Sequence, residues 1–88
     1  MIRLSGSVRS THSADGGVIL DVKHGQIFRF NSTGSRILQL LRSGAEKPEI
    51  ARMLVREFSA DPATAESDTN VFLAALRQNA LLEPQSLR

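Results

Sequence analysis

The chain has 88 residues, eleven Lys and Arg against nine Asp and Glu, a formal net charge of +2, and no cysteine. The absence of cysteine excludes disulfides, thiol nucleophiles and metal centres built on cysteine. No apolar run is long enough to cross a bilayer, and the N-terminus lacks the apolar segment of a signal peptide. These features predict one small cytoplasmic domain over 1–88, with a core over about 8–83 between short tails and no membrane association.

The first thirty residues combine apolar alternation with turn signals and predict antiparallel strands. Val18–Val22 and Gln26–Phe30 flank a short turn in which Gly25 supplies a positive φ, so the two segments are expected to pair as a hairpin. A further strand is predicted over 7–12. Because an isolated hairpin is only marginally stable, this ribbon must pack against helices.

The second strand of this hairpin alternates regularly. Phe28 and Phe30 fall on one face, where they are expected to anchor the core, whereas Ile27 and Arg29 fall on the other. The strand is the last one before the helices. One edge of Gln26–Asn31 is therefore either free to accept an extended peptide or covered by a helix or by the N-terminal strand.

The remainder of the chain places apolar residues at helical spacing and predicts three helices. Asn31 and Ser32 are suitable caps for the first helix and Gly44 follows its end, while Pro48 takes the first helical position of the second. Asp61 and Pro62 open a third helix of about 18 residues. Strands followed by helices are typical of the α+β class. The predicted buried positions are Ile37, Leu38, Leu40, Leu41, Ile50, Met53, Leu54, Phe58, Ala65, Thr69, Phe72, Leu73, Leu76, Ala80, Leu81 and Leu82.

The sequence contains few residue patterns that could support catalysis. His12 lies in a polar stretch and His24 in a predicted turn, and no spacing of histidine with carboxylates suggests a metal site. The glycine turns at 15–17 and 33–35 lack the lysine of a phosphate-binding loop. The sequence therefore predicts a binding module that is not an enzyme and that needs no cofactor or metal.

Two surfaces are candidates for binding. One is the edge of Gln26–Asn31, and the other is a flank of the third helix where Asp68, Val71 and Ala75 lie beside the main apolar stripe. Alternatively, Val71 is simply one of the isolated exposed apolar residues that most proteins carry. Together, a strand edge and a helix flank would form a groove for a peptide.

The third helix argues against binding to nucleic acid. A helix that reads DNA needs cations for phosphates and bases, but 62–82 contains only Arg77 against Glu66 and Asp68. A winged-helix DNA-binding regulator, which two strands with three helices would also fit, therefore remains only as the alternative function. A homodimerisation module is a third possibility, because a free strand edge can also pair with its own copy.

Several short motifs follow one another in a fixed order between residues 8 and 83, and this order resembles the PqqD family. In that family a strand pair ending in an aromatic residue and Asn leads into a helix with an early Gly and a run like Ile-x-x-Leu-Leu. The family often has Val at the position of Thr69 and Gly at the position of Ala80. Without that glycine, Asn79 is available for the left-handed cap of the third helix. The matching segments are 15–21, 25–34, Ile37, Leu40, Leu41, 49–51, Phe58, Asp61, Pro62, Asp68, Phe72, Leu73, Leu76, Leu81 and Leu82.

The resemblance implies a three-stranded antiparallel sheet followed by three helices in a winged-helix-like arrangement. It also implies a recognition element that binds the leader segment of a ribosomally made precursor peptide and presents the precursor to a modifying enzyme. That enzyme would be a lasso-peptide leader protease or a radical-S-adenosylmethionine enzyme, such as the one that makes pyrroloquinoline quinone. In the family, the leader pairs with the third strand and lies against the third helix. Carried onto this chain, the peptide-binding residues are Gln26, Ile27, Phe28, Arg29, Phe30, Asn31, Asp68, Val71 and Ala75.

Overall fold

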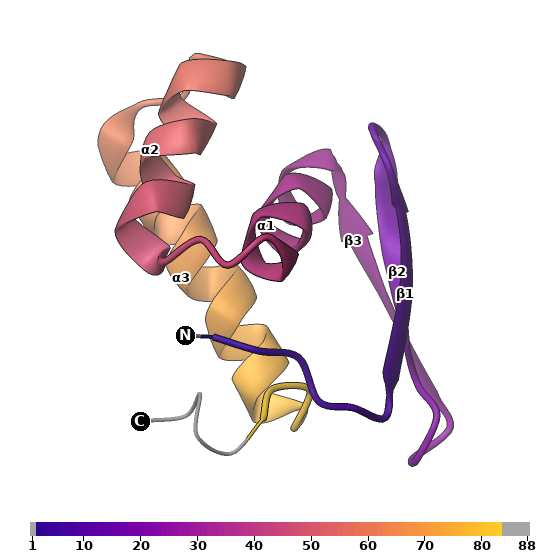
Figure 1. The fold of residues 1–88 in the computed structure, drawn as a ribbon. Coiled ribbons are helices and arrows are strands. Elements are labelled where there is room, and N and C mark those ends of the chain that lie inside the picture. Colours follow the sequence, from indigo (N-terminus) through magenta and orange to yellow (C-terminus); the bar gives the residue numbers. More distant parts are fainter. Residues whose placement is uncertain (1, 84–88) are drawn as a thin grey trace.

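The computed structural model describes residues 2–83, and the predicted tail over 84–88 lies outside the described residues. Three antiparallel strands precede three helices, which confirms the predicted α+β class (Figure 1). Among the described residues, no helix is both long enough and apolar enough to cross a membrane. In chain order the elements are β1 (Val8–Ser13), β2 (Gly16–Asp21), β3 (Gln26–Asn31), α1 (Ser32–Arg42), α2 (Lys47–Phe58) and α3 (Pro62–Gln78).

The sheet has the order β1-β2-β3, so β3 forms one of its edges. All three helices lie on one side of the sheet, and α1 packs directly against it (Figure 1). Ile19 on β2 is fully buried on this inner side, and its neighbour in register on β3, Phe28, is half-buried there. The alternation of β3 is therefore as predicted: Phe28 and Phe30 face the helices, whereas Ile27 and Arg29 face away.

The turn between β2 and β3 is built around a buried carboxylate. Asp21, whose side chain is 3% exposed, accepts a hydrogen bond from the backbone N–H of His24 at 3.3 Å and another from Nδ1 of the His24 ring at 2.7 Å. The predicted positive φ at Gly25 is present, at 66°. The hydrogen bond from the His24 side chain is the main reason why the pKa of Asp21 is lower than usual.

The core lies between the sheet and the helices. As predicted, the segment after α3 folds back, and it buries Leu81 and Leu82. Leu82 pairs with Leu4 in an isolated antiparallel bridge, which closes the domain by joining its two ends. The buried apolar residues are Val8, Ile19, Ile37, Leu38, Leu40, Leu41, Ile50, Leu54, Ala65, Leu73, Leu76, Leu81 and Leu82.

Several helix ends and core positions differ from the prediction. The second helix starts at Lys47 and not at Pro48, because Glu46 and Glu49 form a capping box one residue earlier. Phe58 is 44% exposed and lies at the rim, since α2 ends there. Ala80 is exposed and takes the left-handed conformation expected of Asn79, with a φ of 56°, which turns the chain so that Leu81 enters the core.

The contact between Phe30 and Phe72 joins β3 to α3. The two rings meet edge to face, with centroids 5.9 Å apart and planes at 85°, a favourable arrangement for aromatic pairs. They enclose Gly34 in the first turn of α1. A Cβ atom at that position would lie 2.9 Å from both Phe30 Cβ and Phe72 Cε1, so the close approach requires glycine.

Replacing Gly34 by alanine tests this packing. A Gly-to-Ala change inside a helix ordinarily stabilises a protein by about 0.5–1 kcal/mol. Here we expect the opposite sign, a loss of about 1–3 kcal/mol, because the methyl group collides with both rings. Urea unfolding of Gly34→Ala measures the change. Gly6→Ala is the control, since nothing lies within 4 Å of its added Cβ, and an equal effect of the two substitutions would contradict the packing argument.

The Asp21 carboxylate predicts a loss of stability in acid. Because its folded-state pKa is lowered, its ionised form contributes stability that is complete above the unfolded-state pKa and is lost as the pH falls through the folded-state value. Thermal midpoints measured from about pH 5 down to about pH 2 should therefore fall in the parent chain. The fall should be shallower in Asp21→Asn and in His24→Ala. An unchanged slope in both variants would show that other carboxylates dominate.

Candidate functional site

The outer edge of β3 carries unpaired backbone groups. Among residues 2–83, β2 is the only strand that pairs with β3, and no fourth strand covers its other edge. Exposed edges of this kind are templates for pairing with another extended chain. Of the two alternatives that the sequence left open, coverage by the N-terminal strand is therefore wrong within this part of the chain, because β1 pairs with β2.

The hydrogen-bonding pattern of the sheet identifies which groups point outward. The N–H of Val22 donates to the carbonyl of Ser7 at 3.1 Å, so even-numbered residues of β2 bond to β1. The odd-numbered residues of β2 then bond to β3, where their partners are Gln26, Phe28 and Phe30. It follows that the N–H and C=O groups of Ile27 and Arg29, with the N–H of Asn31, point to the open edge.

A groove of about 260 Å³ opens where β3 passes into α1 and faces the middle of α3. Three of the predicted residues from α3, Asp68, Val71 and Ala75, line it together with Asn31 from the end of β3. Val71 is 65% exposed there, although it is apolar. The structure therefore brings the predicted helix flank next to the end of the free strand edge.

Four further residues, which no sequence pattern marked as part of a site, also line the groove: Thr33, Gly34, Ile37 and Phe72. Ile37 and Phe72 were identified as core residues from helical periodicity, which does not distinguish a core side chain from one that also forms the floor of a groove. The lining is more apolar than polar, and Asp68 is its single charged side chain. Such a surface fits an apolar anchor with a cationic or hydrogen-donating neighbour.

The other predicted residues of β3 do not line this groove. Phe28 and Phe30 point into the core, and Gln26 is exposed at the start of the same face. Asn31, which does line the groove, also accepts a hydrogen bond from the N–H of Gly34 at 2.9 Å as the cap of α1. The side chains of Ile27 and Arg29 lie on the opposite face of the sheet from α3. The six predicted residues of β3 thus divide between the two faces of an edge strand, and the other three lie on α3.

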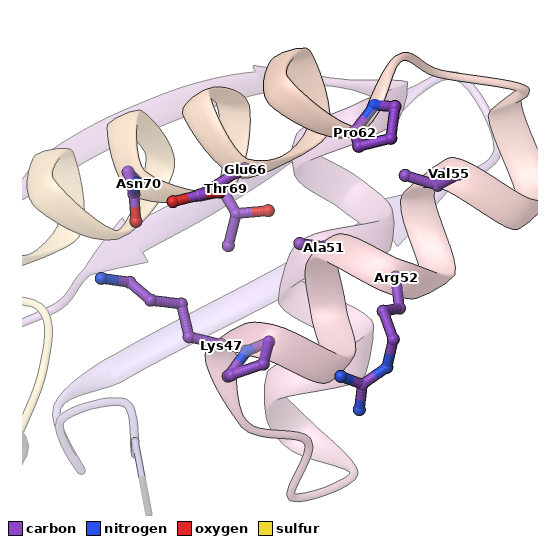
Figure 2. A pocket seen from close by; sticks show the side chains of 9 residues that line it. Lys47, Ala51, Arg52, Val55, Pro62, Glu66, Thr69 and Asn70 are labelled. Carbon is purple, nitrogen blue, oxygen red and sulfur yellow. The ribbon is translucent and has the colours of Figure 1, made fainter.

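A second hollow, of about 450 Å³, lies on the other flank of α3 (Figure 2). It lies along the seam between α2 and α3, and Ala51 and Val55 contribute apolar walls. In Figure 2, Lys47 extends along the gap towards α3, whereas Arg52 points away from it. No strand edge borders this hollow, so it lacks the backbone donors and acceptors that the first groove adjoins.

Charged side chains are distributed unequally: Asp68 alone lines the first groove, whereas Lys47, Arg52 and Glu66 line the second hollow. Within the part of the chain that the structure describes, no group of three or more His, Asp or Glu side chains is placed to hold a metal ion. The Arg36–Glu57 pair, with both contacts at 2.7 Å, joins α1 to α2, and it raises the pKa of Arg36 and lowers that of Glu57. The arrangement suits recognition through backbone hydrogen bonds and apolar contacts.

Two solved structures are similar to this chain over nearly its whole length. One is described as "TbiB1 in Complex with the TbiA(beta) Leader Peptide"; it is 38% identical, with a TM-score of 0.84, and the match covers 93% of this chain and 95% of that one. The other, "Lasso peptide synthetase B1 complexed with the leader peptide", is 26% identical at a TM-score of 0.84, with 94% and 98% covered. No protein with a curated description matches the chain.

The family comparison agrees with the resemblance read from the sequence motifs. The family described as "Coenzyme PQQ synthesis protein D (PqqD)" matches residues 16–82, which include β2, β3 and all three helices. This segment contains both the open strand edge and the groove beside α3. The chain therefore belongs to the PqqD family.

Proposed function

We propose that this chain binds the leader segment of a ribosomally synthesised precursor peptide as a fourth strand on β3 and presents the precursor to a modifying enzyme. The observation that carries the proposal is the open edge of β3, which ends at an apolar groove beside α3. Two similar proteins were solved in complex with leader peptides, which supports the same class of ligand here.

Strand addition would supply most of the backbone recognition. The outward groups of Ile27, Arg29 and Asn31 can exchange hydrogen bonds with an extended peptide, whatever its sequence. A disordered leader loses conformational entropy when it binds, so these bonds need apolar burial beside them. The groove around Val71 and Phe72 provides a place for one or two apolar leader side chains.

The side chains of the added strand would extend over both faces of the sheet. Successive side chains of a strand point to opposite faces, so one row of leader side chains meets the groove and the other lies beside Ile27 and Arg29. All nine predicted residues then have a role in the site, but not the same role. Gln26, Phe28 and Phe30 hold the edge strand in place, whereas the others face the peptide.

In this proposal the chain is a non-catalytic partner of the modifying enzyme, acts in the cytoplasm and uses no cofactor. Its enzyme would be a lasso-peptide leader protease, in view of the similar structures, or a radical-S-adenosylmethionine enzyme. A homodimer paired through β3 would occupy the same edge and would compete with the leader. Nothing in the comparisons favours DNA binding, and both carboxylates of α3, Glu66 and Asp68, are exposed.

Proline at Arg29 tests strand addition directly. Its N–H points to the open edge, so Arg29→Pro removes one donor and places a ring against the incoming strand without breaking a hydrogen bond to β2. We expect leader affinity to fall at least about tenfold while the domain stays folded. The measurement is calorimetric titration with a synthetic leader peptide of the cognate precursor, identified beforehand from the neighbouring genes, together with thermal unfolding.

Two variants control this experiment. Arg29→Ala keeps the N–H and removes only the side chain, so it should lose less affinity than the proline. His12→Pro places the same ring on the opposite edge of the sheet, because the N–H of His12 points away from β2. If His12→Pro weakened the leader complex as much as Arg29→Pro, the peptide would not be pairing with β3.

A charge in the groove tests the contact with α3. Val71→Glu puts a carboxylate on an apolar wall beside Asp68 and should weaken leader binding at least about tenfold, because burying an unpaired charge is costly. Val22→Glu is the matched control, since Val22 is similarly exposed, at 57% against 65%, but lies at the β2–β3 turn. A folded Val71→Glu chain with parental affinity would place the leader elsewhere.

A further inference from the structure

The face of the sheet that points away from the helices is unusually apolar. The register aligns two rows across it, Arg9–Leu20–Ile27 and Thr11–Val18–Arg29. Leu20 is 39% exposed and Ile27 is 62% exposed, and they lie directly opposite each other on neighbouring strands. No described helix or loop covers this face (Figure 1).

Strand β2 has the composition of a strand that is buried on both sides. A sheet with one face in water alternates apolar and polar residues, whereas a strand covered on both faces reads as a continuous apolar run. Val18, Ile19 and Leu20 form such a run, although only Ile19 faces the helices. The packing of this domain alone does not account for Val18 and Leu20 on the other face.

The charges around this apolar strip have one sign. The two rows contain Arg9 and Arg29 and no carboxylate, because Asp21 is buried on the inner face. Within the described residues, neither arginine forms an ion pair, and Arg9 donates only to backbone carbonyls. In a symmetric dimer each copy would bring the same cationic face, so like charges oppose a second copy as the occupant.

We propose that the outer face, defined by Arg9, Val18, Leu20, Ile27 and Arg29, is the docking surface for the modifying enzyme, which would present apolar side chains bordered by carboxylates. This inference rests on the proposed function, because it assigns the partner to which the bound leader is delivered. Carboxylates complement the two unpaired arginines, and apolar side chains would cover Leu20 and Ile27.

The size of this face makes docking dependent on the leader. Three strands of six residues cover only about 300 Å², well below the roughly 800 Å² per partner of a standard interface. A leader strand added at β3 continues the same face and places its own outward side chains beside Ile27 and Arg29. The enzyme therefore binds the complex of chain and leader more tightly than the chain alone.

The test measures enzyme binding and leader binding separately. The probes are the synthetic leader peptide of the cognate precursor and the purified modifying enzyme that processes this precursor. Enzyme affinity is determined by biolayer interferometry with and without the leader. We expect Arg9→Glu and Leu20→Ser to weaken enzyme binding at least about tenfold. Both positions lie off β3, so leader affinity by calorimetry should stay within about twofold of the parent.

Arg52→Glu is the matched control, because it makes the same charge change on exposed α2 beside the second hollow. It should leave enzyme affinity unchanged.

The inference is overturned if Arg9→Glu and Leu20→Ser keep parental enzyme affinity, if Arg52→Glu loses as much, or if the parent does not bind the enzyme at all. It is also overturned if sedimentation shows a parental dimer that Arg9→Glu dissociates. Failure of the parent to bind its leader would instead refute the proposed function.

Discussion

The edge-to-face contact of Phe30 with Phe72 is the interaction on which the candidate site depends. It brings the last residues of β3 against α3, and it is possible only because Gly34 has no side chain between the rings. The same contact leaves a groove beside it, since α3 approaches the strand with its Phe72 side while Val71 stays exposed. The stability of the core and the shape of the groove therefore depend on the same three residues.

Alternate residues of strand β3 have two different roles, one in the stability of the domain and one in the proposed binding of the peptide. Phe28 and Phe30 direct their side chains to the core and their backbone groups to β2, so they hold the strand in the domain. Ile27 and Arg29 direct their side chains to the outer face and their backbone groups to the open edge. A peptide can therefore pair with the strand without disturbing a hydrogen bond or a core contact that the domain needs for folding.

Local sequence signals predicted most of the elements, because each acts within a few residues. The hairpin around Gly25, the aromatic face of β3 and the cap at Asp61 all have the predicted form. The errors lie where neighbouring signals compete. The capping box at Glu46 overrides the proline as the start of α2, and the left-handed residue after α3 is Ala80, because the chain must turn there to bury Leu81.

Local periodicity was enough to predict the class of the fold, the two faces of β3 and the residues of the helix flank, since periods of two and of 3.6 residues follow directly from strand and helix geometry. The packing of separate elements was needed to show that Asp68, Val71 and Ala75 lie beside Asn31, at the end of the strand edge that no described strand covers. It was also needed to show that Ile37 and Phe72 line a groove. These facts depend on how separate elements pack, which no local pattern encodes.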